Sequence, residues 1–339
     1  MSTKMTPREL YLAIAKGEQP DRVPIYTMGF PGYKEEPTVK IIGTSVWEEI
    51  RLSANQGGTR TDIWGVNYVS NAETNFAFIP KPGQFLLEDI TKWRDIIKKP
   101  EFPHVDWERQ AKIDREASGL IPGQSVAMGL IGLMPFQQFI AFMGFTEGLC
   151  AFAEEPEEVA ELLHYLVDAY VPIVKATLDY YEPDMMYLLD DTAAAGNPFI
   201  SLKMFREILM PVYHKLLDPI KERGIPIQLH NCGKCEIFLD DFYDLGVRVW
   251  DPAQEMNDLI GFKQKYKGKM AMAGGFTWKP TSDEAVARKM VRDCIDKYAP
   301  GGGFAFFGAA LGKSGDTISG QVNAWLSDEA YNYGMDFYK

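Results

Sequence analysis

Cysteine and histidine are scarce in this chain, with four of each among 339 residues. So few cysteines in so long a chain exclude a disulfide framework and are typical of a reducing compartment, where thiolates stay free to bind metal. Cys150 and Cys294 fall inside helical patterns, and we expect them to be core residues. Long apolar runs are also missing, and the first residues lack the apolar stretch of a signal peptide. The sequence therefore predicts a cytoplasmic protein with no membrane span.

The chain also has fewer basic than acidic residues. Lys and Arg number 35 against 47 Asp and Glu, which gives a net charge of −12 and a pI near 5.0. A nucleic acid or an anionic membrane would need a basic surface, so we expect neither as a partner. The Gly-rich motifs that bind nucleotides and the G-x-S-x-G turn of serine hydrolases are absent. Nucleotide chemistry and a nucleophilic serine are therefore not supported.

What the chain does contain is a regular alternation of short apolar runs and helical patterns, which is typical of βα units around a parallel sheet. Seven strands are expected, at residues 23–28, 125–130, 184–189, 225–230, 247–251, 270–273 and 303–307. A closed barrel of this kind needs eight strands, so the count is close. We predict the α/β class and a (β/α)8 TIM barrel that forms a single domain over residues 1–339.

Helices and an insertion complete the predicted barrel. Proline and acidic residues mark helix starts near Pro156 and Ser282, and the helices are expected to run to about Tyr181 and Tyr298. Residues 33–105 are less regular and rich in proline. We expect this stretch to pack as an insertion over one end of the barrel.

An H-x-C motif gives the clearest sign of chemistry. His230 and Cys232 directly follow a predicted strand, and because side chains alternate along a strand, both point the same way. Barrel enzymes carry their chemistry at the carboxyl ends of the strands, and an imidazole with a thiolate is the beginning of a zinc site. The alternative is a strand-end histidine beside a small buried thiol. Cys235 completes a C-x-x-C, but the chain has no second such pair.

Acidic residues end the two strands on either side of this motif. Asp190 and Asp191 end the preceding strand and Asp251 the following one, so three successive strands bring acid–base or metal-binding groups to one edge. The alternatives are that Asp190 or Asp191 caps the next loop, and that Asp251 opens a turn before its proline. The expected catalytic residues are His230, Asp190, Asp191 and Asp251, and the expected metal ligands are His230, Cys232 and Asp251, with zinc as the metal.

Five segments resemble the uroporphyrinogen decarboxylase superfamily, and together they span nearly the whole chain. They are residues 19–28, 61–66, 188–191, 230–234 and 273–275. The resemblance is closer to the corrinoid-dependent methyltransferase branch, which includes methylcobalamin:coenzyme M methyltransferases and the aryl methyl ether O-demethylases of anaerobic bacteria, such as the veratrol-demethylase type. It implies a decorated TIM barrel with its site at the carboxyl-end mouth.

Two departures from the family distinguish its branches. Decarboxylases carry arginines after the first strand to bind carboxylates, whereas this chain has no arginine between Met28 and Arg51. Coenzyme M methyltransferases have a second zinc cysteine at the last strand end, whereas residues 306–312 here contain none. A thiol substrate needs zinc held by soft ligands, but an ether oxygen needs only polarisation or a proton. The resemblance thus implies the methyltransferase I of an O-demethylase.

The implied reaction moves the methyl group of a methoxylated aromatic to the Co(I) of a separate corrinoid protein. The cobalamin is expected on that partner because this chain lacks a D-x-H-x-x-G cobalt-binding segment. Apolar residues at strand ends would wall the pocket, although each also suits a core position. They are Tyr26, Met28, Phe30, Met134, Phe136, Phe139, Tyr187, Phe306 and Phe307.

Three other functions stay open at this point. They are a thiol methyltransferase, a porphyrinogen decarboxylase and a non-catalytic accessory that binds a metal or corrinoid. The sequence does not set the oligomeric state, for which a homodimer is the working expectation.

Overall fold

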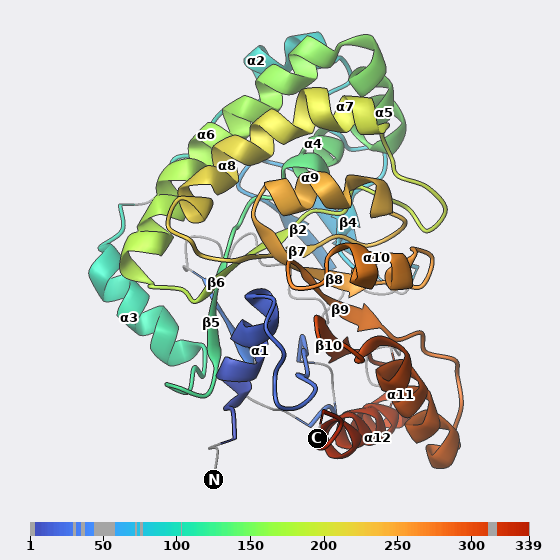
Figure 1. The fold of residues 1–339 in the computed structure, drawn as a ribbon. Helices are drawn as coiled ribbons and strands as arrows, with labels where there is room; N and C mark the ends of the chain where they lie inside the picture. Colours follow the sequence, from blue (N-terminus) through green and yellow to red (C-terminus); the bar gives the residue numbers. More distant parts are fainter. Residues whose placement is uncertain are drawn as a thin grey trace.

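The computed structural model of the protein describes residues 4–29, 32–34, 38–43, 58–71, 73–74, 77–102, 104–310 and 317–338. Its centre is a curled sheet in which all seven strands pair in parallel, in the order β1-β5-β6-β7-β8-β9-β10 (Figure 1). The strands are β1 (Val39–Ile42), β5 (Val126–Leu130), β6 (Met185–Leu189), β7 (Ile227–His230), β8 (Val247–Ala253), β9 (Ala271–Gly275) and β10 (Phe304–Phe307). The predicted α/β, TIM-barrel-like fold is confirmed.

The amino-terminal third departs from the strands expected there. The predicted strand at 23–28 makes a single parallel bridge, between Ile25 and Phe306 beside β10. Strand β1, in contrast, lies inside the stretch 33–105 that we expected to be irregular, and it pairs with β5. The same stretch forms a separate antiparallel sheet of β2 (Gly58–Thr61), β3 (Asn67–Ser70) and β4 (Ile79–Pro80).

Helices surround the main sheet. They are α1 (Pro7–Ala15), α2 (Trp93–Ile96), α3 (Trp107–Ala117), α4 (Pro135–Met143), α5 (Phe145–Glu154), α6 (Pro156–Tyr180), α7 (Leu202–Met204), α8 (Met210–Lys221), α9 (Leu239–Asp244), α10 (Leu259–Lys265), α11 (Glu284–Tyr298) and α12 (Thr317–Gly334). Short 3-10 turns at Ile90–Lys92 and Glu236–Phe238 and a π-helical turn at Phe205–Leu209 complete them. Figure 1 shows α6 beside α8 on one outer side and α11 beside α12 on the other. None of the described helices is long and apolar enough to cross a membrane.

The two helices predicted from their start signals form as expected. Helix α6 begins with Pro156 at its first position and has two glutamates in its first turn. Helix α11 is capped by Asp283, whose carboxylate accepts hydrogen bonds from the backbone amides of Ala285 and Val286. The helix ends at Tyr298. A fixed proline φ and an acid near the positive end of the helix dipole explain why both helices begin where they do.

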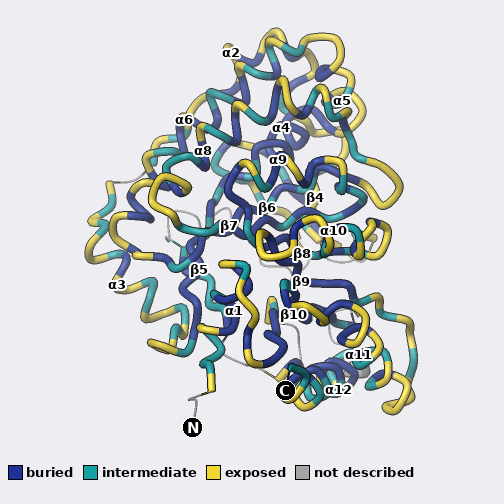
Figure 2. The backbone as a smooth tube through the Cα atoms, in the orientation of Figure 1, coloured by how far each residue is buried: buried dark blue, intermediate teal, exposed yellow. Residues whose placement is uncertain are grey.

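The strands separate two apolar layers because their side chains alternate in direction. Leu188, Leu229 and Trp250 face outward into a large layer beneath the helices. Tyr187 and Val249 face inward and meet residues of α1. Figure 2 shows the sheet as the continuously buried part of the chain, with exposure concentrated on the outer helices and loops. The inner layer sets the direction in which polar side chains at the strand ends point.

Candidate functional site

The candidate site lies where β6, β7 and β8 end. His230 is the last residue of β7, and it is in register with Leu189 of β6 and Asp251 of β8. Gln228 precedes His230 by two residues and therefore faces the same interior. Strands β7 and β8 thus place an imidazole, an amide and a carboxylate side by side inside the barrel.

Asp251 fixes the orientation of the His230 ring. Its Oδ1 lies 2.7 Å from His230 Nδ1 and also accepts a hydrogen bond of 3.2 Å from the Tyr187 hydroxyl. A carboxylate only accepts hydrogen bonds, so Nδ1 carries a proton in either charge state of the ring, and Nε2, on the opposite side, offers its lone pair once the ring is neutral. Burial works against a charge on His230, but the neighbouring Asp251 outweighs it and raises the pKa of the imidazole well above its usual value.

A metal-type cluster forms around that Nε2 atom. Among the described residues, Asp191, His230 and Cys232 place one ligand atom each within 4.8 Å of one another, and all three are partly buried. Asp191 Oδ1 accepts a hydrogen bond of 2.6 Å from the Cys232 backbone amide, which holds the two residues together. The cluster lies at the carboxyl ends of β6 and β7, as expected for the chemical end of a barrel.

The geometry of the cluster fits zinc. Two zinc bonds of about 2.3 Å to sulfur and about 2.0 Å to nitrogen, at a tetrahedral angle, would separate the two ligand atoms by about 3.5 Å. The observed distance from Cys232 Sγ to His230 Nε2 is 3.5 Å. Oxygen, nitrogen and sulfur are the donors that zinc takes, and three protein ligands leave the fourth position that catalytic sites keep for water or substrate.

Two predicted roles are corrected by these contacts. Asp251 was expected to be a metal ligand, but it bonds the Nδ1 side of the ring, away from the cluster. Asp190 was expected to be catalytic, but its carboxylate accepts hydrogen bonds from the Phe136 and Gln137 amides at the start of α4 and from the Tyr213 hydroxyl. Asp190 therefore caps a helix, and its burial raises the pKa of the carboxyl to about 7.

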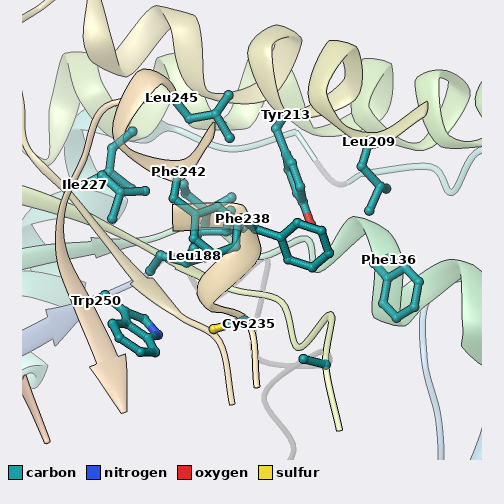
Figure 3. Packing of buried hydrophobic residues seen from close by; sticks show 14 of the residues in the cluster. Phe136, Leu188, Leu209, Tyr213, Ile227, Cys235, Phe238, Phe242, Leu245 and Trp250 are labelled. Carbon is teal, nitrogen blue, oxygen red and sulfur yellow. The ribbon is translucent and has the colours of Figure 1, made fainter. Parts of the chain in front are cut away.

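Cys235 does not join the ligand atoms. Its side chain is fully buried, and its thiol donates to the Asn231 carbonyl at 3.7 Å. Figure 3 shows Cys235 among the apolar residues of the outer layer, in the same cluster as Phe238 and Trp250. Burial raises the pKa of this thiol, which opposes formation of the thiolate that a metal would need.

The predicted pocket residues fall into three groups. Tyr26, Tyr187 and Phe307 belong to the interior layer, where the Tyr26 and Phe307 rings lie 4.9 Å apart. Met28 is 41% exposed and Met134 is partly buried at the start of α4. Phe136, Phe139 and Phe306 pack in the outer layer beneath the helices, apart from the interior layer, and their role as pocket walls stays a prediction. Phe30 lies outside the described residues.

Two residues that the sequence did not single out belong to the site. Gln228 Nε2 donates to Asp251 Oδ2 at 2.5 Å, and the Tyr11 hydroxyl of α1 donates to Gln228 Oε1 at 2.8 Å. The sequence did carry a signal for Gln228. It is a polar residue within an apolar predicted strand, two positions before His230, so its side chain must face the same way, and it is fully buried in the structure. No local signal links Tyr11 to it, since the two are far apart in the sequence.

A pocket of about 590 Å³ lies at the opposite, amino-terminal end of β7, β8 and β9, beside α1. Five of its fourteen lining residues are basic, but two of these five already serve the fold. Lys221 donates to the Asp244 carbonyl, and Arg248 donates to the Tyr243 and Val247 carbonyls at the carboxyl end of α9 and the start of β8. Cations are favoured at helix carboxyl ends, so these contacts account for much of the basic character of the pocket.

The fold and the cluster together define a TIM-barrel-type protein with a metal-type site at its strand ends. The chain belongs to the uroporphyrinogen decarboxylase (URO-D) family, whose model matches residues 118–319, more than half of the chain. The fold is similar to that of a methyltransferase from Methanosarcina mazei, with a TM-score of 0.59 and 15% identity over 97% of this chain and 99% of that one. A putative vitamin-B12 independent methionine synthase from Listeria monocytogenes gives a TM-score of 0.44 and 13% identity over 70% of this chain and 72% of that one. No curated protein matches the sequence.

Proposed function

We propose that the protein is the methyltransferase I of an O-demethylase system, which transfers the methyl group of an aryl methyl ether to the Co(I) of a separate corrinoid protein. The observation that carries this proposal is the Asp191–His230–Cys232 cluster, which offers one sulfur, one nitrogen and one carboxylate oxygen at the mouth of a URO-D family barrel. A single soft ligand suits the polarisation of an ether oxygen better than the activation of a thiol.

The metal that these residues would hold is zinc, which supplies Lewis acidity toward the ether oxygen when bound. Asp191, His230 and Cys232 would hold it, and the Asp251 contact at Nδ1 would keep the imidazole nitrogen Nε2 turned toward it. Asp191, His230 and Cys232 are partly buried and Asp251 is fully buried. The low dielectric of such a setting strengthens the electrostatic stabilisation of the leaving oxygen.

The interior aromatic residues give the site its preference for an uncharged ring. Tyr26, Tyr187 and Phe307 belong to the interior layer, and the Tyr187 hydroxyl lies 3.3 Å from His230 Nδ1. In the reaction they bind the arene and orient its methyl carbon toward the mouth. Holding the methyl carbon in place raises its effective concentration toward the cobalt, which supplies much of the rate. The partner corrinoid protein would dock over the same mouth in a transient encounter of modest area.

The test is a panel reaction with the zinc-loaded protein, reduced cobalamin and methoxyarenes of the guaiacol and veratrol type, with methylcobalamin formation followed by its visible spectrum. We expect methylcobalamin with at least one uncharged phenyl methyl ether. A matched reaction of methylcobalamin with a small thiol tests the rival thiol methyltransferase, and a porphyrinogen tests the decarboxylase. No methylcobalamin from any methoxyarene, or turnover in either rival reaction, would show the assignment to be wrong.

A further inference from the structure

A buried chain of hydrogen bonds runs from the amino-terminal helix to the imidazole of the cluster. The Tyr11 hydroxyl donates to Gln228 Oε1 at 2.8 Å, and Gln228 Nε2 donates to Asp251 Oδ2 at 2.5 Å. Asp251 Oδ1 then lies 2.7 Å from His230 Nδ1. Tyr11, Gln228 and Asp251 are each 0% exposed, so water does not compete for these bonds.

The direction of every bond in this chain is fixed by chemistry. The Asp251 carboxylate can only accept, so Gln228 must turn its NH2 group toward Asp251. The Gln228 carbonyl oxygen then points to the other side, where only a donor satisfies it, and the Tyr11 hydroxyl is that donor. If Gln228 rotated by half a turn, two acceptors would face each other inside the barrel, which costs free energy without compensation.

Helix α1 holds Tyr11 firmly in this position. A capping box between Thr6 and Glu9 closes its amino end. Arg8 pairs with Asp184 just before β6. Tyr11, Ile14 and Ala15 pack into the interior layer together with Tyr187. The hydroxyl therefore comes from a rigid element that fills the amino end of the barrel.

We propose that Tyr11 and Gln228 are positioning residues that hold Asp251, and through it the Nε2 atom of His230, in the orientation that binds metal. Docking of α1 and metal affinity are then coupled, although α1 does not touch the cluster. This inference rests on the proposed metal site, and it adds two residues and one helix to the machinery that supports it. Because coupling between two sites is reciprocal, metal binding must also stabilise the docked helix.

The measurement is zinc affinity, determined by competition with a chromophoric chelator, for the wild type, Tyr11→Phe and Gln228→Met. Outer-shell partners of metal ligands typically change metal affinity by about 10- to 100-fold. Gln228→Met should weaken zinc binding by about 10-fold and Tyr11→Phe by about 3- to 10-fold, because the latter removes one hydrogen bond further out. The double variant should be weakened less than the product of the two single effects, since both act through one chain.

Tyr181→Phe is the matched control. Tyr181 is also 0% exposed and donates to Asp114 Oδ2 at 2.6 Å, in a separate cluster with Ala111. It should lose stability as Tyr11→Phe does and keep the zinc affinity of the wild type. Equal zinc affinities for Tyr11→Phe and Tyr181→Phe would overturn the inference.

Hydrogen exchange gives a second readout that does not depend on activity. Zinc should slow exchange of the α1 amides in the wild type, and this effect should shrink in Tyr11→Phe. Unchanged α1 exchange on zinc binding would contradict the coupling. The metal site and the role of Tyr11 and Gln228 can fail separately. A wild type that binds no zinc overturns both. Zinc binding that is unchanged in Tyr11→Phe and Gln228→Met overturns only the role of these two residues.

Discussion

His230 and Asp251 are register partners on adjacent parallel strands, and the 2.7 Å contact between Nδ1 and Oδ1 turns the other ring nitrogen toward Cys232. Metal-binding histidines commonly donate their second N–H to a carboxylate, which sets the tautomer and the ring orientation. The barrel supplies this partner from the neighbouring strand, so the orientation of the ligand is built into the sheet register.

Replacing His230 by Ala should remove the central ligand of the cluster. We expect zinc content and methyl transfer each to fall by about 10-fold or more, because the remaining carboxylate and thiolate no longer enclose the ion. Zinc per chain by elemental measurement and the initial rate of methylcobalamin formation check this. His214→Ala is the control, since His214 is partly exposed on α8 and pairs with Asp218. Unchanged zinc content in His230→Ala would place the metal elsewhere.

Asp191 and Asp251 should behave differently when each is changed. Asp191→Ala removes a ligand, so zinc should stay substoichiometric at metal concentrations that saturate the wild type. Asp251→Asn removes only the charge that orients His230, so zinc should still reach one per chain, with affinity lower by about 10- to 100-fold. A zinc titration of both variants separates stoichiometry from affinity. The opposite pattern would restore Asp251 to the ligand set that the sequence predicts.

Asp190 and Asp191 show which part of the site the sequence could not predict. The H-x-C spacing predicts that His230 and Cys232 lie together, because His230 ends strand β7 and Cys232 follows it by only two positions. Asp190 and Asp191 follow a strand that is apolar on both faces, so its pattern does not tell which of them points inward. Only packing decides, and it places Tyr187 inward and hence Asp191 toward the site.

The strands were also only partly predictable from the sequence. Six of the seven predicted strands form, since short apolar runs that alternate with helical patterns are a strong signal. Strand β1 was missed because a lysine interrupts its short apolar run and it lies within the proline-rich stretch 33–105. The interior and outer aromatic residues could not be told apart either, because buried strands carry apolar side chains on both faces.

Asp190→Ala should lower stability without disturbing the metal. The carboxylate satisfies two amides at the start of α4 and the Tyr213 hydroxyl, all in a buried setting. Leaving such groups without partners costs about 1–3 kcal/mol. Urea unfolding of the zinc-free protein measures the loss, and zinc stoichiometry should stay as in the wild type. A large loss of zinc with unchanged stability would mean that Asp190 serves the site after all.

Lys263 should make stability depend on pH above neutrality. Burial of this α10 lysine, with a smaller contribution from Lys267, lowers its pKa from 10.5 to about 8. Between these values the unfolded chain binds more protons than the folded one, so the contribution of Lys263 to stability rises with pH across this window. Below about pH 8 the folded protein bears the full cost of the buried charge.

Lys263→Met should therefore be more stable than the wild type by about 1 kcal/mol at pH 7, allowing for partial solvent contact. The difference should shrink as the pH approaches 10. Urea midpoints at pH 7, 8, 9 and 10 test this. Lys289→Met is the control, because Lys289 is exposed on α11 and its removal should leave the pH dependence unchanged. A constant difference between Lys263→Met and wild type at all four pH values would show that the lysine keeps its ordinary titration.

Helix α1 and the side chains it meets fill the amino end of the barrel, with Tyr11, Ile14 and Ala15 buried against Tyr187. In the proposed reaction the arene and the corrinoid protein would therefore both approach the cluster from the carboxyl-end mouth, where it lies. The arene then has to enter first, and the demethylated phenol cannot leave until the corrinoid protein has dissociated. Steady-state kinetics should accordingly follow a compulsory order, with excess corrinoid protein slowing turnover by trapping the product beneath it.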